Sequence, residues 1–207
     1  MVDAGARRWS GVAKALHWTM ALAILAEVPA GFAMAWSYSA KDAEGHAWHI
    51  LTSQIHHTIG MIVLVAVIFR LCWRFTHPVP PLPRTTGRAA AMLAHGTQAA
   101  LYALLLMIPL TGWGALSALA GGADFPAPSM WFLGHDGFGP GGMIPHLVPA
   151  VPYNSPAFFN YGLFAFSHVY LLMAGAIFLI LHVAGALRHH FILKDDVLRR
   201  MLPGGNA

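Results

Sequence analysis

The segment HVYLLMAGAIFLILH, residues 168–182, carries a histidine at each end and no charged residue between them. If the segment is helical, His168 and His182 are separated by almost four full turns, so they share one face about 21 Å apart along the axis. An uncharged apolar segment of this kind, with its flanks, is long enough to cross a bilayer. Polar side chains inside a membrane helix are costly and usually functional. The segment therefore predicts a transmembrane helix with two functional histidines.

The composition extends this prediction to the whole chain. Hydrophobic residues make up 57% of the 207 residues and charged residues only 10%, whereas about a quarter of the residues of a soluble domain are charged. The charge-poor intervals predict four spans, near 13–36, 50–73, 91–118 and 160–186. We expect an all-α integral membrane protein, a bundle of four transmembrane helices in which residues 1–207 form a single domain surrounded by lipid.

The basic residues predict the orientation of the chain in the membrane. Those on one side are Arg7, Arg8, Lys14, Arg70, Arg74, Arg84, Arg88, Arg188, Lys194, Arg199 and Arg200. Only Lys41 falls on the other side, so we expect both termini and the middle connection in the cytoplasm. This placement explains the net charge of +4 without a nucleic-acid partner. A single cysteine, Cys72, excludes a CxxCH motif and gives no support for covalent haem attachment.

A long connection rich in Gly, Pro and aromatic residues follows the third span, over residues 119–159. We predict that it lies on the periplasmic side, because it joins the external ends of the third and fourth spans. One interpretation is a cap whose aromatic side chains, among them Trp131, Phe132, Phe138 and Tyr153, sit at headgroup level. The other is a surface for partner docking or substrate access, because long structured loops are usually functional.

The histidines at membrane depth form two predicted pairs. His17 lies near the cytoplasmic end of the first span, at the depth of His182. His56 and His57 lie near the external end of the second span, at the depth of His168. Two imidazoles that face each other across a helix bundle are the arrangement of bis-histidine haem b, whereas zinc favours four clustered ligands. The sequence therefore predicts two b haems, one near each side of the membrane.

Small residues and one arginine accompany these histidines. Gly31, Gly60 and Gly175 lie on or near the histidine faces, where a flat porphyrin needs clearance; ordinary close packing of membrane helices is the alternative explanation. Arg70 lies fourteen residues after His56, hence on the same face at the cytoplasmic level. It could bind a haem propionate or extend to the headgroups.

The ordered motifs resemble the bacterial cytochrome b561 family, which is related to superoxide oxidase and to Ni/Fe-hydrogenase-type cytochrome b subunits. The segments that carry the resemblance are KALHWTMA, HHTIG, RLCWRFTHPVPPLP, YALLLMIPLTGW and HVAGALRHHFILKDDVLRRM. Together they cover nearly the whole chain except the external connection. The resemblance places the family's haem ligands on His17, His56, His168 and His182, and it favours His56 over His57 because the family's histidine stands four residues before a glycine.

The resemblance also implies a function. It suggests a four-helix, di-haem b protein of the bacterial inner membrane that exchanges electrons with quinone. Some relatives pass electrons from periplasmic superoxide to ubiquinone, and others anchor a periplasmic or peripheral dehydrogenase. We therefore expect either a quinone-linked oxidoreductase with a periplasmic donor, superoxide or a redox protein, or an electron-transfer subunit whose partner docks on the long loop. A non-haem membrane scaffold or transporter is the third hypothesis, and the oligomeric state is left open.

Two further polar residues are candidates for proton or quinone chemistry. Glu27 is an acid inside the first span, a departure from the family, and lies roughly 80° from the His17 face of that helix. It could deliver protons to a quinone or bond to a neighbouring carbonyl. His95, near the cytoplasmic end of the third span, could contact a propionate, a quinone or the headgroups.

Overall fold

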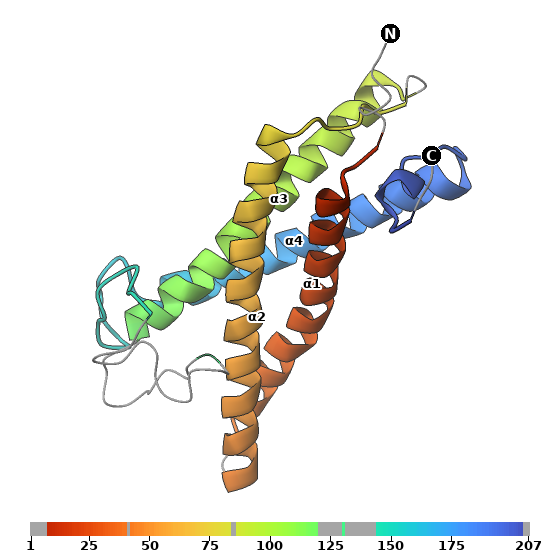
Figure 1. Cartoon of the computed structure of the whole chain (residues 1–207). Coiled ribbons are helices and arrows are strands. Elements are labelled where there is room, and N and C mark those ends of the chain that lie inside the picture. The colour runs from red at the N-terminus through yellow and green to blue at the C-terminus, as the bar shows by residue number, and fades with distance from the viewer. Residues whose placement is uncertain (1–7, 41, 84–85, 120–129, 131–143, 205–207) are drawn as a thin grey trace. The chain divides into compact units, whose positions relative to one another are not determined.

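A computed structural model describes residues 8–40, 42–83, 86–119, 130 and 144–204. Four long helices make up most of these residues: α1 (Gly11–Ser37), α2 (Ala43–Thr76), α3 (Arg88–Leu119) and α4 (Tyr161–Phe191). They follow one another along the chain as the colours of Figure 1 show. A short 3-10 helix, η2 (Arg199–Met201), follows α4. The prediction of an all-α chain with four spans is confirmed for the described residues.

The helices are longer than the predicted spans, and polar residues cap the starts of three of them, α1, α2 and α4. Ser10 Oγ accepts a hydrogen bond from the Ala13 backbone N–H at the start of α1. Asp42 accepts from Gly45 N–H before α2, and Asn160 accepts from Leu163 N–H before α4. Such caps satisfy backbone donors that have no partner within the helix. They explain why α2 begins at Ala43, seven residues before the span predicted from hydropathy.

All four helices are long and apolar enough to cross a membrane. Their outward side chains are largely hydrophobic; examples with more than half of their surface exposed are Leu25, Phe69, Met92 and Ile180. None of the residues of α4 is buried in the described structure. Exposure of this extent is unfavourable in water and is what lipid tails accommodate. The chain is therefore a four-span membrane protein.

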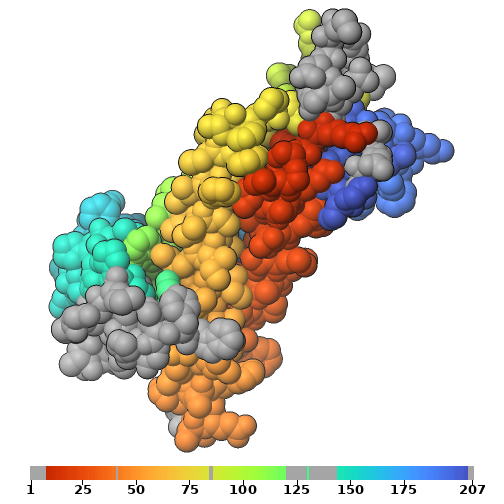
Figure 2. Space-filling view, viewed as in Figure 1, coloured from red at the N-terminus to blue at the C-terminus, as the bar shows by residue number. Residues whose placement is uncertain are grey.

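The contacts divide the chain into two compact units, and every helix contributes to both. The terminal unit comprises Met1–Ala21, Ala66–Leu106 and Leu172–Ala207, and the loop unit comprises Leu22–Val65 and Met107–Leu171. Inside the loop unit, the side chains of α1 and α2 meet along the two helices (Figure 2). We describe the two units separately below.

The described part of the long connection packs on the end of α3. Ile144 is buried against Trp113, Leu116 and Met130. The Trp113 indole N–H donates to the Pro145 carbonyl at 2.9 Å, and the Leu147 N–H donates to Ser117 Oγ at 3.1 Å. Residues 144–151 are thus fixed to the helix end. Trp131, Phe132 and Phe138, which the sequence predicts to anchor or dock, lie outside the described residues.

Candidate cofactor site

The loop unit brings together one of the two predicted histidine pairs. The rings of His56, on α2, and His168, on α4, have centroids 6.0 Å apart and planes inclined at 80°. The His57 ring centroid lies 6.1 Å from that of its neighbour His56. Of the two adjacent histidines, His56 is therefore the one that meets His168. Both rings of the pair are half-buried.

The terminal unit contains the second predicted pair. His17, on α1, and His182, on α4, have ring centroids 6.1 Å apart with planes inclined at 64°. The Trp18 ring lies edge-on to His17 at 5.2 Å. Helix α4 therefore supplies one histidine to each unit, His168 to the loop unit and His182 to the terminal unit, as the spacing of fourteen residues predicts.

The separation of the rings suits a metal ion between them. An ion bound in line by two imidazoles lies about 2.0–2.1 Å from each nitrogen, and each ring centre lies roughly 1.1 Å further, so the centres stand roughly 6.3 Å apart. The observed distances of 6.0 and 6.1 Å are close to this value. No group of three or more His, Cys, Asp or Glu gathers around a possible metal position in the described part of the chain. The histidines meet as pairs.

A backbone carbonyl orients the His168 ring. His168 Nδ1 lies 2.8 Å from the carbonyl oxygen of Ile108 on α3, and the hydroxyl of Thr111 lies 3.4 Å from the same nitrogen. A carbonyl can only accept, so Nδ1 carries the proton and donates. The opposite nitrogen, Nε2, is then unprotonated and free to bind a metal ion.

Glycines lie where the neighbouring helices approach these side chains most closely. A Cβ atom at Gly31 would stand 3.1 Å from the His56 ring, and one at Gly112 would stand 3.3 Å from the His168 ring. A Cβ at Gly60 would stand 3.2 Å from the carboxylate of Glu27. Gly31 and Gly60 leave room for a ring and a carboxylate, and their predicted clearance for a porphyrin stays a prediction. The clearance predicted at Gly175 stays a prediction.

Arg70 belongs to the terminal unit, where its Nε donates to the Tyr102 hydroxyl at 3.1 Å. Its guanidinium also lies over the Tyr102 ring, 5.7 Å from the centroid. His17 and His182 belong to the same unit as Arg70. Arg70 is thus held beside this histidine pair, in a position suited to an anionic group bound there.

The two remaining candidates differ in their surroundings. The Glu27 carboxylate lies against His56, with Oε1 3.0 Å from the ring Nδ1. His95 is exposed on α3. The sequence alone did not indicate that Glu27 faces a histidine of another helix, because its position was judged only against the His17 face of α1.

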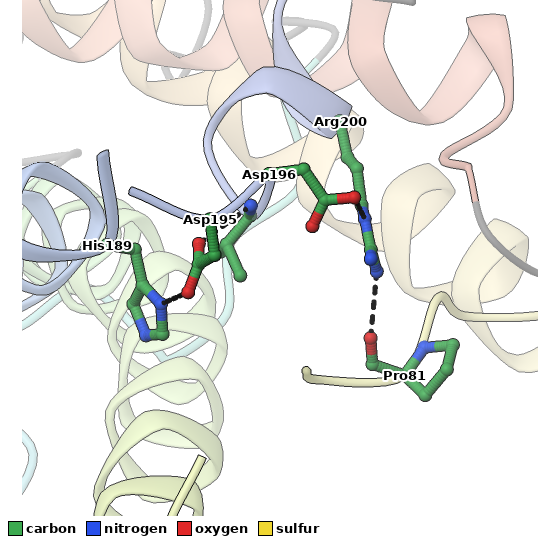
Figure 3. A network of polar contacts seen from close by, with 6 residues as sticks. Pro81, His189, Asp195, Asp196 and Arg200 are labelled. Atoms are coloured by element: carbon green, nitrogen blue, oxygen red, sulfur yellow. Dashed lines mark hydrogen bonds and ion pairs between the residues drawn. The ribbon is translucent and has the colours of Figure 1, made fainter. Parts of the chain in front are cut away.

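The segment after α4 folds back over the terminal unit through polar contacts (Figure 3). His189 pairs with Asp195, and Arg200 pairs with Asp196 at 2.8 Å and donates to the Pro81 carbonyl at 3.0 Å. The Trp18 indole N–H donates to the Met201 carbonyl at 2.8 Å. Because Trp18 is adjacent to His17, these bonds attach the C-terminal segment beside the His17–His182 pair.

We expect Trp18→Phe to loosen this C-terminal segment. The change removes one hydrogen bond worth about 0.5–1.5 kcal/mol and keeps an aromatic ring, so the detached state should become about two- to tenfold more populated. Trypsin cleavage after Arg199 and Arg200 in detergent measures it, with Trp36→Phe as the control because Trp36 is 87% exposed. An unchanged cleavage rate would show that other contacts hold the segment.

Comparison with known proteins places this geometry in context. The model of the family described as prokaryotic cytochrome b561 matches residues 8–204, nearly the whole chain. The chain belongs to the prokaryotic cytochrome b561 family. The predicted resemblance is therefore confirmed, and haem b is the cofactor that family membership implies.

Several named proteins are similar to this chain over most of their length. Cytochrome b561 homolog 2 of Escherichia coli (strain K12) is 28% identical over 94% of this chain and 91% of that protein. The probable superoxide oxidase CybB of Yersinia pestis is 25% identical, over 95% of this chain and 97% of the relative. Cytochrome b562 of Cereibacter sphaeroides is 27% identical over 90% of each chain.

The donor set of both pairs fits haem b of the cytochrome b561 family: two imidazoles, no thiol, and an ordered Nδ1 partner at His168. Sequence reasoning missed Gly112 and the Ile108 carbonyl. Both lie in IPLTG (108–112), inside the motif YALLLMIPLTGW that carried part of the resemblance. That motif was a signal that α3 approaches the site, although it did not reveal which histidine α3 contacts.

Proposed function

We propose that this chain is a di-haem b membrane oxidoreductase that moves electrons between a donor on the periplasmic side and membrane quinone. The observation that carries the proposal is the presence of one histidine pair in each compact unit, with ring centroids 6.0 and 6.1 Å apart. His56 and His168 would hold one haem, and His17 and His182 the other. When bound, haem supplies a one-electron couple between ferric and ferrous iron.

The proposed orientation places the terminal unit at the cytoplasmic side and the loop unit at the periplasmic side. Arg8, Arg74 and Arg188 lie in the terminal unit together with most other basic residues, as the positive-inside rule requires. The long connection, residues 119–159, then faces the periplasm.

Different groups of the protein would orient the haem ligands and bind the haem propionates. The Ile108 carbonyl holds the His168 tautomer that presents Nε2. Arg70, steadied by Tyr102, would bind a propionate of the haem between His17 and His182 through charge-assisted hydrogen bonds. The apolar surfaces of the four helices keep the sites dry. Glu27 is treated separately below, and His95 remains a candidate contact for quinone.

Superoxide is the donor that we propose first, because a relative that matches 95% of the chain is named a probable superoxide oxidase. Two superoxide anions would each release one electron and become dioxygen, and ubiquinone would take up the two electrons and two protons to become ubiquinol. The alternative is an electron-transfer or anchor subunit for a periplasmic dehydrogenase, with the partner docked on the long connection.

The first experiment measures haem in the purified full-length chain. We expect a dithionite-reduced minus oxidised spectrum typical of bis-histidine haem b and a pyridine haemochrome ratio near two haems per chain. The same preparation is then given superoxide from xanthine and xanthine oxidase together with a soluble ubiquinone analogue. We expect ubiquinol to form faster than in a control with the heat-denatured protein.

The outcomes separate the hypotheses. Two haems with rapid ubiquinol formation support the self-contained oxidoreductase. Two haems that are reducible but give no superoxide-dependent ubiquinol favour the subunit alternative. A ratio near one, or no Soret band, would overturn the di-haem proposal.

A further inference from the structure

Glu27 and His56 lie against each other inside the loop unit, on α1 and α2. Their side chains are only 18% and 17% exposed, and Glu27 Oε1 stands 3.0 Å from His56 Nδ1. An acidic side chain within a transmembrane helix is energetically unfavourable unless it has a polar partner. Since His56 is a proposed haem ligand, the contact places a carboxyl group directly behind the ligand.

A glycine on each helix makes room for the polar side chain of the other helix. Gly31 stands four residues after Glu27 on α1, and Gly60 stands four residues after His56 on α2, so each glycine lies one turn from the polar residue of its own helix. A Cβ at Gly31 would crowd the His56 ring at 3.1 Å, and a Cβ at Gly60 would crowd the Glu27 carboxylate at 3.2 Å. Each glycine therefore makes room for the polar side chain of the opposite helix.

Among the described residues, neither side chain of the pair has another well-aligned hydrogen-bond partner for these atoms. His56 Nδ1 and Glu27 Oε2 are both buried and make no aligned hydrogen bond there. A buried donor or acceptor left unsatisfied costs about 1–3 kcal/mol, so a small rotation that aligns Nδ1–H with Oε1 is favourable.

We infer that Glu27 is a positioning residue for His56: its carboxyl oxygen accepts the Nδ1–H hydrogen bond and leaves Nε2 to bind the haem iron. This inference rests on the proposed function. At His168 the same role falls to the Ile108 carbonyl, so the two ligands of one haem have different partners. A carboxyl acceptor makes imidazole a stronger electron donor, which stabilises ferric over ferrous iron.

The test is a redox titration of the purified full-length protein with both haems bound. Loss of an outer partner of a metal ligand typically costs ten- to a hundredfold in metal affinity or activity, and we expect an effect of the same size on the ferric/ferrous equilibrium. For Glu27→Ala we expect the ferrous form of one haem to gain by that factor, which raises its midpoint potential by about 60–120 mV at 59 mV per tenfold change. The other haem should keep its potential, and the low-spin electron paramagnetic resonance signal of the affected haem should shift.

Three further variants serve as controls for the redox titration. Glu27→Gln retains a carbonyl acceptor and should restore most of the wild-type potential. Gly60→Ala leaves the acid in place but pushes its carboxylate by a few tenths of an ångström, and should give a smaller shift of the same haem. Glu44→Ala removes a carboxylate that is exposed at the start of α2 and should shift neither.

Unchanged potentials in Glu27→Ala, or equal shifts of both haems, would overturn the inference. If Glu27→Ala does not accumulate, an unchanged potential and an unchanged resonance signal in Gly60→Ala would overturn it as well. A wild-type protein with fewer than two haems counts against the proposed function and not against the contact between Glu27 and His56.

Discussion

His168→Ala is expected to lose one of the two proposed haems and to keep the other. The alanine removes one of the two axial imidazoles, and the remaining His56 has no second histidine opposite it on α4 within the loop unit. His17 and His182 belong to the terminal unit and stay intact. The pyridine haemochrome ratio should therefore fall by about half, because bis-histidine ligation needs both rings.

Two sets of variants control this prediction. His182→Ala should remove the other haem, so the two single variants should differ in the potential of the haem that remains. His56→Ala should repeat the His168→Ala result, while His57→Ala should keep both haems because the His56 ring is the one that meets His168. Loss of the same haem in His57→Ala but not in His56→Ala would contradict the ligand assignment.

The second large effect is expected from Gly112→Leu. A Cβ atom at this position already stands 3.3 Å from Cε1 and Nδ1 of His168, and the remaining leucine atoms need space that the ring occupies. Overpacking of this kind displaces side chains at a cost of about 1–3 kcal/mol. The His168 ring would leave the Ile108 carbonyl, which holds it at 2.8 Å. We expect the haem content to fall towards one per chain.

The matched control lies on the same helix. Gly96 has nothing within 4 Å of its Cβ position, so Gly96→Leu should retain both haems and the wild-type yield of folded protein. Gly31→Leu, which crowds His56 from α1, should lose the same haem as Gly112→Leu. If Gly112→Leu keeps both haems with unchanged spectra, α3 does not confine His168 and the geometry of this contact is wrong.

The sequence indicated much of the fold because transmembrane helices follow from few local rules. Charge-poor intervals of sufficient length predicted all four spans; the structure begins α2 seven residues earlier, after the Asp42 cap, and ends α4 five residues later. The fourteen-residue spacing of His168 and His182 fixed their common face, since the helix period alone determines it. Matching depths then predicted both histidine pairs.

The arrangement around each ring could not be predicted in the same way. Helices surrounded by lipid are apolar on all sides, so no amphipathic stripe indicates which face turns towards a neighbour. Glu27 was judged against His17 on its own helix, whereas its contact is with His56 on α2. The partner of His168 is a backbone carbonyl, Ile108, and every residue has one, so no side-chain pattern marks it.

The sequence by itself therefore determined the four helices and the family, and it predicted the pairing of the histidines, because these depend on local composition, helical period and ordered motifs. Only the tertiary structure decided that Gly31, Gly60 and Gly112 make room for particular side chains. It also decided that an acid stands behind one proposed ligand and a carbonyl behind another. These features depend on the rotation of each helix about its axis, which is set by packing against its neighbours.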